Sequence, residues 1–154
     1  MLFKRNTLRK VLSADDLKLI AQAIGEAEMR TAGEIRVSIH ERRHRRERKV
    51  PLHELALQEF HRLGMQNTRD RTGILIYILF SERKFHIVAD EGIHKVVAEG
   101  TWNRIADKMS HRFRAGEFRD GIIDGVKHVG EVLAAHVPRR PDDTNELPNT
   151  VQIG

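Results

Sequence analysis

The stretch GILIYILF, residues 73–80, constrains the fold of this chain more than any other feature. It is apolar without the alternation of a half-exposed strand, which predicts a central strand covered on both faces. It is also far shorter than the roughly 20 residues that a membrane helix needs. The stretch KFHIVADEGI, residues 84–93, begins with alternating apolar side chains and follows after only Ser81-Glu82-Arg83. Such a short connection predicts an antiparallel hairpin.

The segment before this hairpin predicts a helix followed by a strand. Ser13 and Asp16 have the spacing of a helix-capping pair, and apolar residues then recur at helical intervals as far as Ala27. Apolar and polar residues alternate through 34–39, which is typical of a strand with one buried face.

Three further helices complete the predicted fold. One begins near Pro51 and ends at Gly64, and two others have apolar faces over 102–113 and 118–133, separated by Gly116. The order is helix, strand, helix, strand, strand, helix, helix. Because the central strand needs cover on both sides, we expect an α/β fold: a three-layer α/β/α sandwich, Rossmann-like, with a small mixed central sheet.

Length and composition indicate one soluble domain. The chain has 154 residues, and we expect a basic N-terminal segment over 1–12, the domain over 13–137 and a C-terminal tail over 138–154. It has no cysteine, which excludes disulfides and thiolate metal sites. We recognise no signal peptide or membrane anchor, so a cytoplasmic location is expected.

Positive charge is concentrated in the first ten residues and in residues 41–49, although the net charge of the whole chain is only +5. In the second segment, Arg42, Arg43, Arg45 and Arg46 are candidate anion-binding residues, because clustered cations release counterions when they bind phosphates. The segment lacks aromatic residues that could stack on bases, which argues against nucleic acid as a partner. Peripheral contact with acidic surfaces and a simply solvated loop are the two remaining interpretations.

The predicted hairpin also gathers acidic residues. With a three-residue loop, Ile74 would lie opposite Asp90, so Asp70 before the first strand would lie beside Asp90 and Glu91 after the second. Carboxylates held close together attract hard divalent cations. On residue types alone, a charged surface turn neutralised by neighbouring arginines explains the same residues.

A series of motifs in order resembles the TPM domain, a family that includes thylakoid-lumen, photosystem II repair and receptor-modulating proteins. The resemblance spans roughly residues 13–149 and is similar to the short, soluble bacterial branch of the family. The motifs are Thr31-Ala32-Gly33-Glu34-Ile35-Arg36-Val37, Phe60-His61-Arg62-Leu63-Gly64-Met65, Thr68 to Ile76, Ala89 to Ile93, Trp102, the segment around Gly116, and Asn145-Glu146-Leu147-Pro148.

This resemblance implies an α/β/α fold that binds a divalent cation, calcium especially, through acidic loops at one end of the sheet. By position, Asp90 matches the strand-end acid of the family and Glu34 matches its glutamate. The candidate metal ligands are therefore Asp90 and Glu34, which the resemblance implies, together with Asp70 and Glu91, which the hairpin would bring beside Asp90. Some relatives are described as acid phosphatases, which makes Asp90 the candidate catalytic residue.

The loop HERRHRRERKV, residues 40–50, departs from the family, whose members often have acidic or small polar residues there. If the first strand runs parallel to the central strand, this loop lies at the opposite end from Asp90 and Glu34 lies at the same end. If the two strands are antiparallel, the basic loop lies beside Asp90. The sequence leaves both arrangements open.

The sequence therefore predicts a TPM-like, divalent-cation-binding domain that serves in interaction or assembly with a protein partner. One alternative is a metal-dependent acid phosphatase, and another is a non-enzymatic binder of anions or membrane surfaces through the Arg-rich loop. No P-loop, nucleophile elbow or dinucleotide-binding turn is present. Phosphatase chemistry would therefore need a metal ion or a carboxylate nucleophile such as Asp90.

Overall fold

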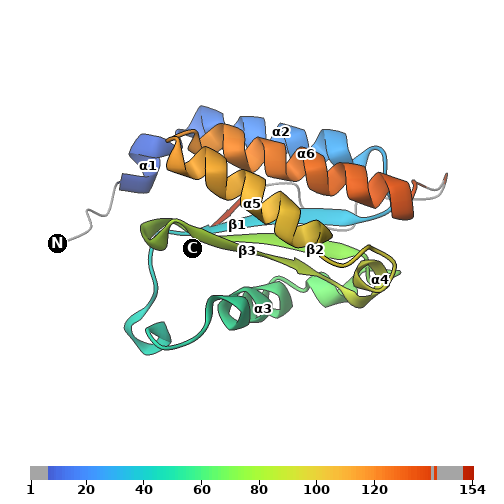
Figure 1. The fold of residues 1–154 in the computed structure, drawn as a ribbon, viewed down its shortest axis with the longest axis horizontal. Helices are drawn as coiled ribbons and strands as arrows, with labels where there is room; N and C mark the ends of the chain where they lie inside the picture. The colour runs from blue at the N-terminus through green and yellow to red at the C-terminus, as the bar shows by residue number, and fades with distance from the viewer. Residues whose placement is uncertain (1–6, 140, 142–150) are drawn as a thin grey trace.

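The structure is a computed structural model that describes residues 7–139, 141 and 151–154. A four-stranded sheet lies between two helical layers (Figure 1). Its strands, in spatial order, are β3 (Lys84–Ala89), β2 (Gly73–Leu79), β1 (Glu34–His40) and β4 (Gln152–Ile153). One face is covered by α2 (Ala14–Glu28), α5 (Thr101–Arg114) and α6 (Phe118–His136), and the other by α3 (Leu52–Arg62). The predicted α/β/α sandwich is confirmed.

Strand β2 is the centre of the core because both of its faces are buried, as the apolar stretch predicts. Its isoleucines Ile74, Ile76 and Ile78 pack in the larger apolar cluster with α2, α5 and α6. Leu75 and Leu79 point the other way and pack with α3. The alternation of side chains along a strand therefore serves two cores at once.

Local signals correctly predicted the beginning of α2 and the end of α3. Ser13 caps α2, because its Oγ accepts from the backbone N–H of Asp16 (3.1 Å) while Oδ2 of Asp16 accepts from the N–H of Ser13 (2.9 Å). After α3, Gly64 takes a left-handed conformation with φ of 71°, which a glycine adopts without steric cost.

The register predicted for the hairpin is wrong by one residue. Ile74 pairs with Ala89 and not with Asp90. The reason is that Phe80 leaves the strand, becomes fully buried and begins a 3-10 turn, which ends at Arg83 with φ of 52°. The connection is therefore four residues long and not three.

The structure contains two elements at the ends of the chain that the sequence analysis did not predict. Helix α1 (Thr7–Val11) precedes α2, and Leu8 and Leu12 lie buried in the larger apolar cluster. Strand β4 pairs with β1 in parallel, although its residues were expected to belong to a tail. The expected tail residues 142–150, with the Asn-Glu-Leu-Pro motif, lie outside the described residues.

The direction of β1 decides which loops share an end of the sheet. It runs parallel to β2, and Glu34 pairs with Gly73. Glu34 therefore lies at the end that also holds Asp70, Asp90 and Glu91, which we call the carboxylate end. The Arg-rich loop that follows β1 lies at the opposite end, where α1 and the β2–β3 turn are also found (Figure 1). We call this second end the basic end.

Candidate functional site

At the carboxylate end, the turn after β3 packs directly on the segment before β2. The N–H of Asp90 donates to the carbonyl oxygen of Gly73 (3.0 Å), and the N–H of Gly92 donates to that of Arg71 (2.8 Å). A Cβ at position 92 would lie 2.1 Å from the carbonyl oxygen of Asp70, so only glycine permits this contact. Backbone packing thus holds the two acidic segments together.

Asp90 has the most distinctive environment of the predicted site residues. It caps the short helix α4 (Glu91–His94), because its Oδ1 accepts from the N–H of Glu91 (2.8 Å). Its Oδ2 is buried and has no hydrogen-bond partner among the described residues. A buried carboxylate oxygen is normally hydrogen-bonded, so this atom is the strongest candidate for a ligand contact.

The other acids at this end are less well placed. Asp70 and Glu91 are exposed, and Oδ2 of Asp70 lies 3.8 Å from Nε of Arg69. Within the part of the chain that the structure describes, no three His, Asp or Glu side chains come together as a metal site. A cation here would therefore need main-chain carbonyl oxygens and water as additional ligands.

Glu34 contacts a buried glutamate of α2, although it lies at the same end of the sheet as these acids. Its carboxyl group is hydrogen-bonded to that of Glu28, and both side chains are buried. Burial and this contact raise the pKa of Glu28 to about 9, although Oε2 of Glu28 also accepts from the N–H of Ile35 (2.9 Å). The pair therefore retains a proton at neutral pH. The sequence analysis missed Glu28, whose place four residues after Ile24, on the buried face of α2, is the signal that could have found it.

A second buried polar cluster joins α3 to β1, and the sequence analysis missed it as well. Oε2 of Glu59 lies 2.7 Å from Nε2 of His40 and accepts from Oγ of Ser38, while Oε1 accepts from Nε of Arg62 (2.5 Å). Burial alone would raise the pKa of Glu59, but the hydrogen bonds from His40, Arg62 and Ser38 hold it well below its usual range. Ser38 is fully buried, so its hydroxyl stabilises Glu59 and is not accessible as a nucleophile.

This cluster corrects the prediction that β1 is half-exposed. Arg36 and Ser38, expected to face solvent, are buried beneath the α3 layer. Burial lowers the pKa of Arg36, and its Nε has no hydrogen-bond partner among the described residues. The carboxylate of Glu59 supplies the opposing charge.

At the basic end, Arg43 holds the Arg-rich loop in place. Its Nε lies 2.6 Å from Oε2 of Glu82 in the β2–β3 turn, and its Nη1 donates to the carbonyl oxygens of Glu47 (2.9 Å) and Val50. Arg43 is therefore occupied by structural contacts. The other three of the four candidate anion-binding residues are exposed, and their side chains make no hydrogen bond to the described chain; these are Arg42, Arg45 and Arg46.

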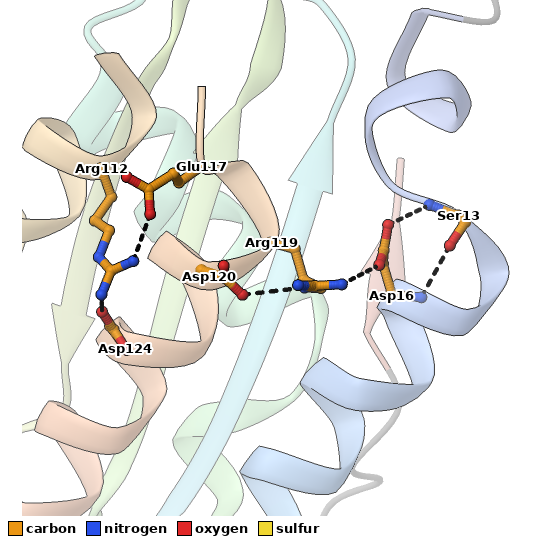
Figure 2. Close-up of polar contacts among 7 residues, drawn as sticks. All are labelled: Ser13, Asp16, Arg112, Glu117, Arg119, Asp120 and Asp124. Atoms are coloured by element: carbon orange, nitrogen blue, oxygen red, sulfur yellow. Dashed lines mark hydrogen bonds and ion pairs between the residues drawn. The ribbon is translucent and has the colours of Figure 1, made fainter. Parts of the chain in front are cut away.

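Other arginines near this end are neutralised by ion pairs, as Figure 2 shows. Arg112 on α5 lies 2.6 Å from Glu117 and 2.7 Å from Asp124. Arg119 on α6 bridges to Asp16 of α2 at 3.2 Å and to its neighbour on α6. These pairs tie the helices together and engage both guanidinium groups, so Arg112 and Arg119 are less available to an external anion than the exposed arginines of the loop.

Comparisons with known proteins agree with this architecture. The TPM domain matches residues 6–132 of the chain. The NMR structure of the BA42 protein from the psychrophilic bacterium Bizionia argentinensis is 36% identical, with a TM-score of 0.84, over 93% of this chain and 95% of that one. No match was found among curated proteins.

Two more distant NMR structures share the fold. The N-terminal domain of a P. gingivalis protein is 22% identical (TM-score 0.67, 82% of this chain and 79% of that one). The N-terminal domain of a Corynebacterium glutamicum protein is 13% identical (TM-score 0.57, 79% and 74%). In the described part of the chain, no helix has the length and apolar character needed to cross a membrane. From its match over residues 6–132 and its likeness to BA42, the chain belongs to the TPM domain family.

Proposed function

We propose that this TPM domain binds a divalent cation, calcium in the first instance, at the carboxylate end and thereby supports contact with a protein partner. The observation that carries the proposal is the buried Oδ2 of Asp90, which has no hydrogen-bond partner in the described chain. A hard cation would satisfy this oxygen, because calcium prefers oxygen ligands and tolerates irregular geometry.

The neighbouring segments supply the remaining chemistry of the proposed site. Asp70 and Glu91 flank Asp90 in the two segments that the Gly92 contact holds together. Glu34 is not part of the proposed ligand set, because it bonds to Glu28. With few protein carboxylates and several waters as ligands, the site would bind calcium weakly, with a dissociation constant on the order of 10⁻⁴–10⁻³ M.

Calorimetric titration with calcium and with magnesium tests the proposal. The variant Asp90→Asn keeps the size and helix-capping ability of the side chain but removes its charge. Asp107→Asn on α5 removes an equal charge from an exposed position that is not part of the proposed site. We expect heat of binding and a raised melting temperature for the wild type and for Asp107→Asn, and neither for Asp90→Asn. A wild-type protein that gives no heat and no shift in melting temperature at millimolar calcium rejects the proposal.

The same variants distinguish a binding domain from a metal-dependent acid phosphatase. A phosphatase would release phosphate from an aryl phosphate at mildly acidic to neutral pH, would require the cation, and would lose activity in Asp90→Asn. A binding domain would show no turnover in any of the three proteins.

A second candidate function is contact with an acidic membrane surface through the basic end. The observation that favours it is the fixed conformation of the Arg-rich loop, which Arg43 holds against Glu82. A fixed loop presents Arg42, Arg45 and Arg46 without a large cost in conformational entropy on binding.

Sedimentation with lipid vesicles tests this second candidate. The triple variant Arg42→Ser/Arg45→Ser/Arg46→Ser is compared with Arg104→Ser/Lys108→Ser/Arg114→Ser, which removes the same charge from exposed positions on α5. We expect the loop variant alone to lose binding to vesicles that contain phosphatidylserine, and added salt to weaken wild-type binding. Equal binding by both triple variants would eliminate the loop as the contact.

A further inference from the structure

Strand β3 lies at one edge of the sheet, and no described strand pairs with its outer side. In an antiparallel pair, alternate residues direct both backbone groups toward the neighbouring strand. Because the N–H of Asp90 donates to Gly73, Lys84, His86 and Val88 share this inward direction. The other three residues of the strand, Phe85, Ile87 and Ala89, direct their N–H and C=O groups outward.

These outward groups have no backbone partner in the described chain. A cavity of about 510 Å³ runs beside the strand, and its walls include His86 from the α3 side of the sheet and Ile87 and Ala89 from the α5 side. Because the lining comes from both faces of β3, the cavity crosses the open edge of the strand. The segment 94–103 bounds it but does not fill it.

This edge also lacks three of the devices by which monomeric proteins protect exposed strands. Such edges commonly carry proline, a bulge or an inward-pointing charge. Between Phe85 and Ala89, β3 has no proline, no bulge in its pairing with β2 and no Asp, Glu, Lys or Arg. Lys84 is the only one of these charged residues in the strand, at its first position.

The sequence of β3 complements itself when a second copy is placed antiparallel to it. With Ile87 opposite its counterpart, Phe85 lies opposite Ala89, so all three outward-facing residues form hydrogen-bonded pairs. The same register sets Lys84 of each copy opposite Asp90 of the other. Opposite charges therefore meet at both ends of the paired segment, which favours this register over its neighbours.

We propose that β3 is an interface for a second copy of this chain. The two β3 strands would pair antiparallel about Ile87 and join the two four-stranded sheets into one continuous sheet. The contact consists of one short strand from each protomer, so the dimer is weak and forms at high protein concentration. It does not depend on the proposed cation site, and the experiment is therefore performed in the presence of a chelator.

Two variants of the full chain disrupt the junction without touching the β2–β3 pairing. Ala89→Pro removes an outward-facing N–H, and Lys84→Glu places a carboxylate opposite Asp90 in both halves of the dimer. Lys18→Glu makes the same charge change at an exposed position on α2. Sedimentation equilibrium is expected to show self-association of the wild type and of Lys18→Glu, weakened about tenfold or more in the two edge variants.

Hydrogen exchange of the backbone amides supplies a readout that does not depend on the variants. Protection of Phe85, Ile87 and Ala89 is expected to rise with protein concentration, whereas protection of His86 and Val88 stays constant because these amides pair with β2. A chain that remains monomeric at millimolar concentration overturns the proposal. So does a dimer that leaves the three outward amides unprotected or tolerates both edge variants, which would indicate another interface.

Discussion

Glu28 and Glu59 have nearly the same burial but opposite electrostatic behaviour. Glu28 at the end of α2 is 6% exposed and Glu59 on α3 is 5% exposed, and both contact β1. Glu28 faces a second carboxyl group and its pKa rises to about 9, whereas Glu59 receives hydrogen bonds from three side chains and its pKa falls. Burial disfavours the charged form in both, so the partners decide which form the fold stabilises.

The two shifts make opposite contributions to stability as the pH changes. The contribution of Glu28 is complete below the ordinary glutamate pKa of 4.5 and is lost as the pH rises toward about 9. The contribution of Glu59 is complete above that ordinary pKa and is lost as the pH falls through its lowered pKa. Glu28 therefore destabilises the fold as the pH rises, and Glu59 destabilises it at low pH.

The largest effect on stability is expected from Glu59→Ala, which removes the glutamate whose charged form the fold stabilises. It removes the acceptor of Ser38 and His40 and leaves Arg36 buried without its opposing charge. We expect the free energy of unfolding in urea at pH 7 to fall by about 3–5 kcal/mol. Gln58→Ala, at an exposed position of the same helix, should lose little. Equal losses in the two variants would show that Glu59 does not stabilise the cluster.

A smaller effect of opposite sign is expected from Glu28→Gln. The amide keeps the hydrogen bonds to Glu34 and Ile35 but cannot lose a proton. Stability should match that of the wild type near pH 4 and exceed it by about 1–3 kcal/mol at pH 8, because the wild type alone is weakened as the pH rises. Denaturation across this pH range, with the exposed Glu26→Gln as control, measures the difference. Parallel pH curves for wild type and Glu28→Gln would contradict the raised pKa.

The smallest effect is expected from Arg62→Ala. The side chain of Arg62 is 63% exposed, so water screens its ion pair with Glu59. We expect a loss of about 1 kcal/mol or less, which should shrink further at high salt. Thermal denaturation at two salt concentrations measures it. A loss as large as that of Glu59→Ala would mean that Arg62, and not the buried donors, stabilises the carboxylate.

Much of the fold could be predicted because its signals are local. The Ser13–Asp16 cap, the glycine after α3 and the unbroken apolar stretch of β2 each specify an element through neighbouring residues alone. The register of the hairpin failed because it depends on the burial of Phe80, which packs edge-on against Phe118 at 4.9 Å between ring centres. That contact joins residues far apart in the chain.

The candidate site was predicted less completely than the fold. The sequence analysis predicted that Asp70, Asp90 and Glu91 lie at one end of the sheet. A one-residue error in the register of the hairpin does not change this prediction. It could not show that Glu34 bonds to Glu28, or that Arg43 bonds to Glu82. These partners depend on how helices and turns meet, and residue types alone do not specify such contacts.

The contacts of Arg43 show that the residue that holds the Arg-rich loop in its conformation differs from the arginines that the loop exposes to solvent. Among the arginines of the loop, Arg43 alone makes side-chain hydrogen bonds to the described chain, so the other arginines can be substituted without loss of these bonds. The segment is therefore a suitable place to graft a short recognition sequence onto this domain, provided that Arg43 and Glu82 are retained.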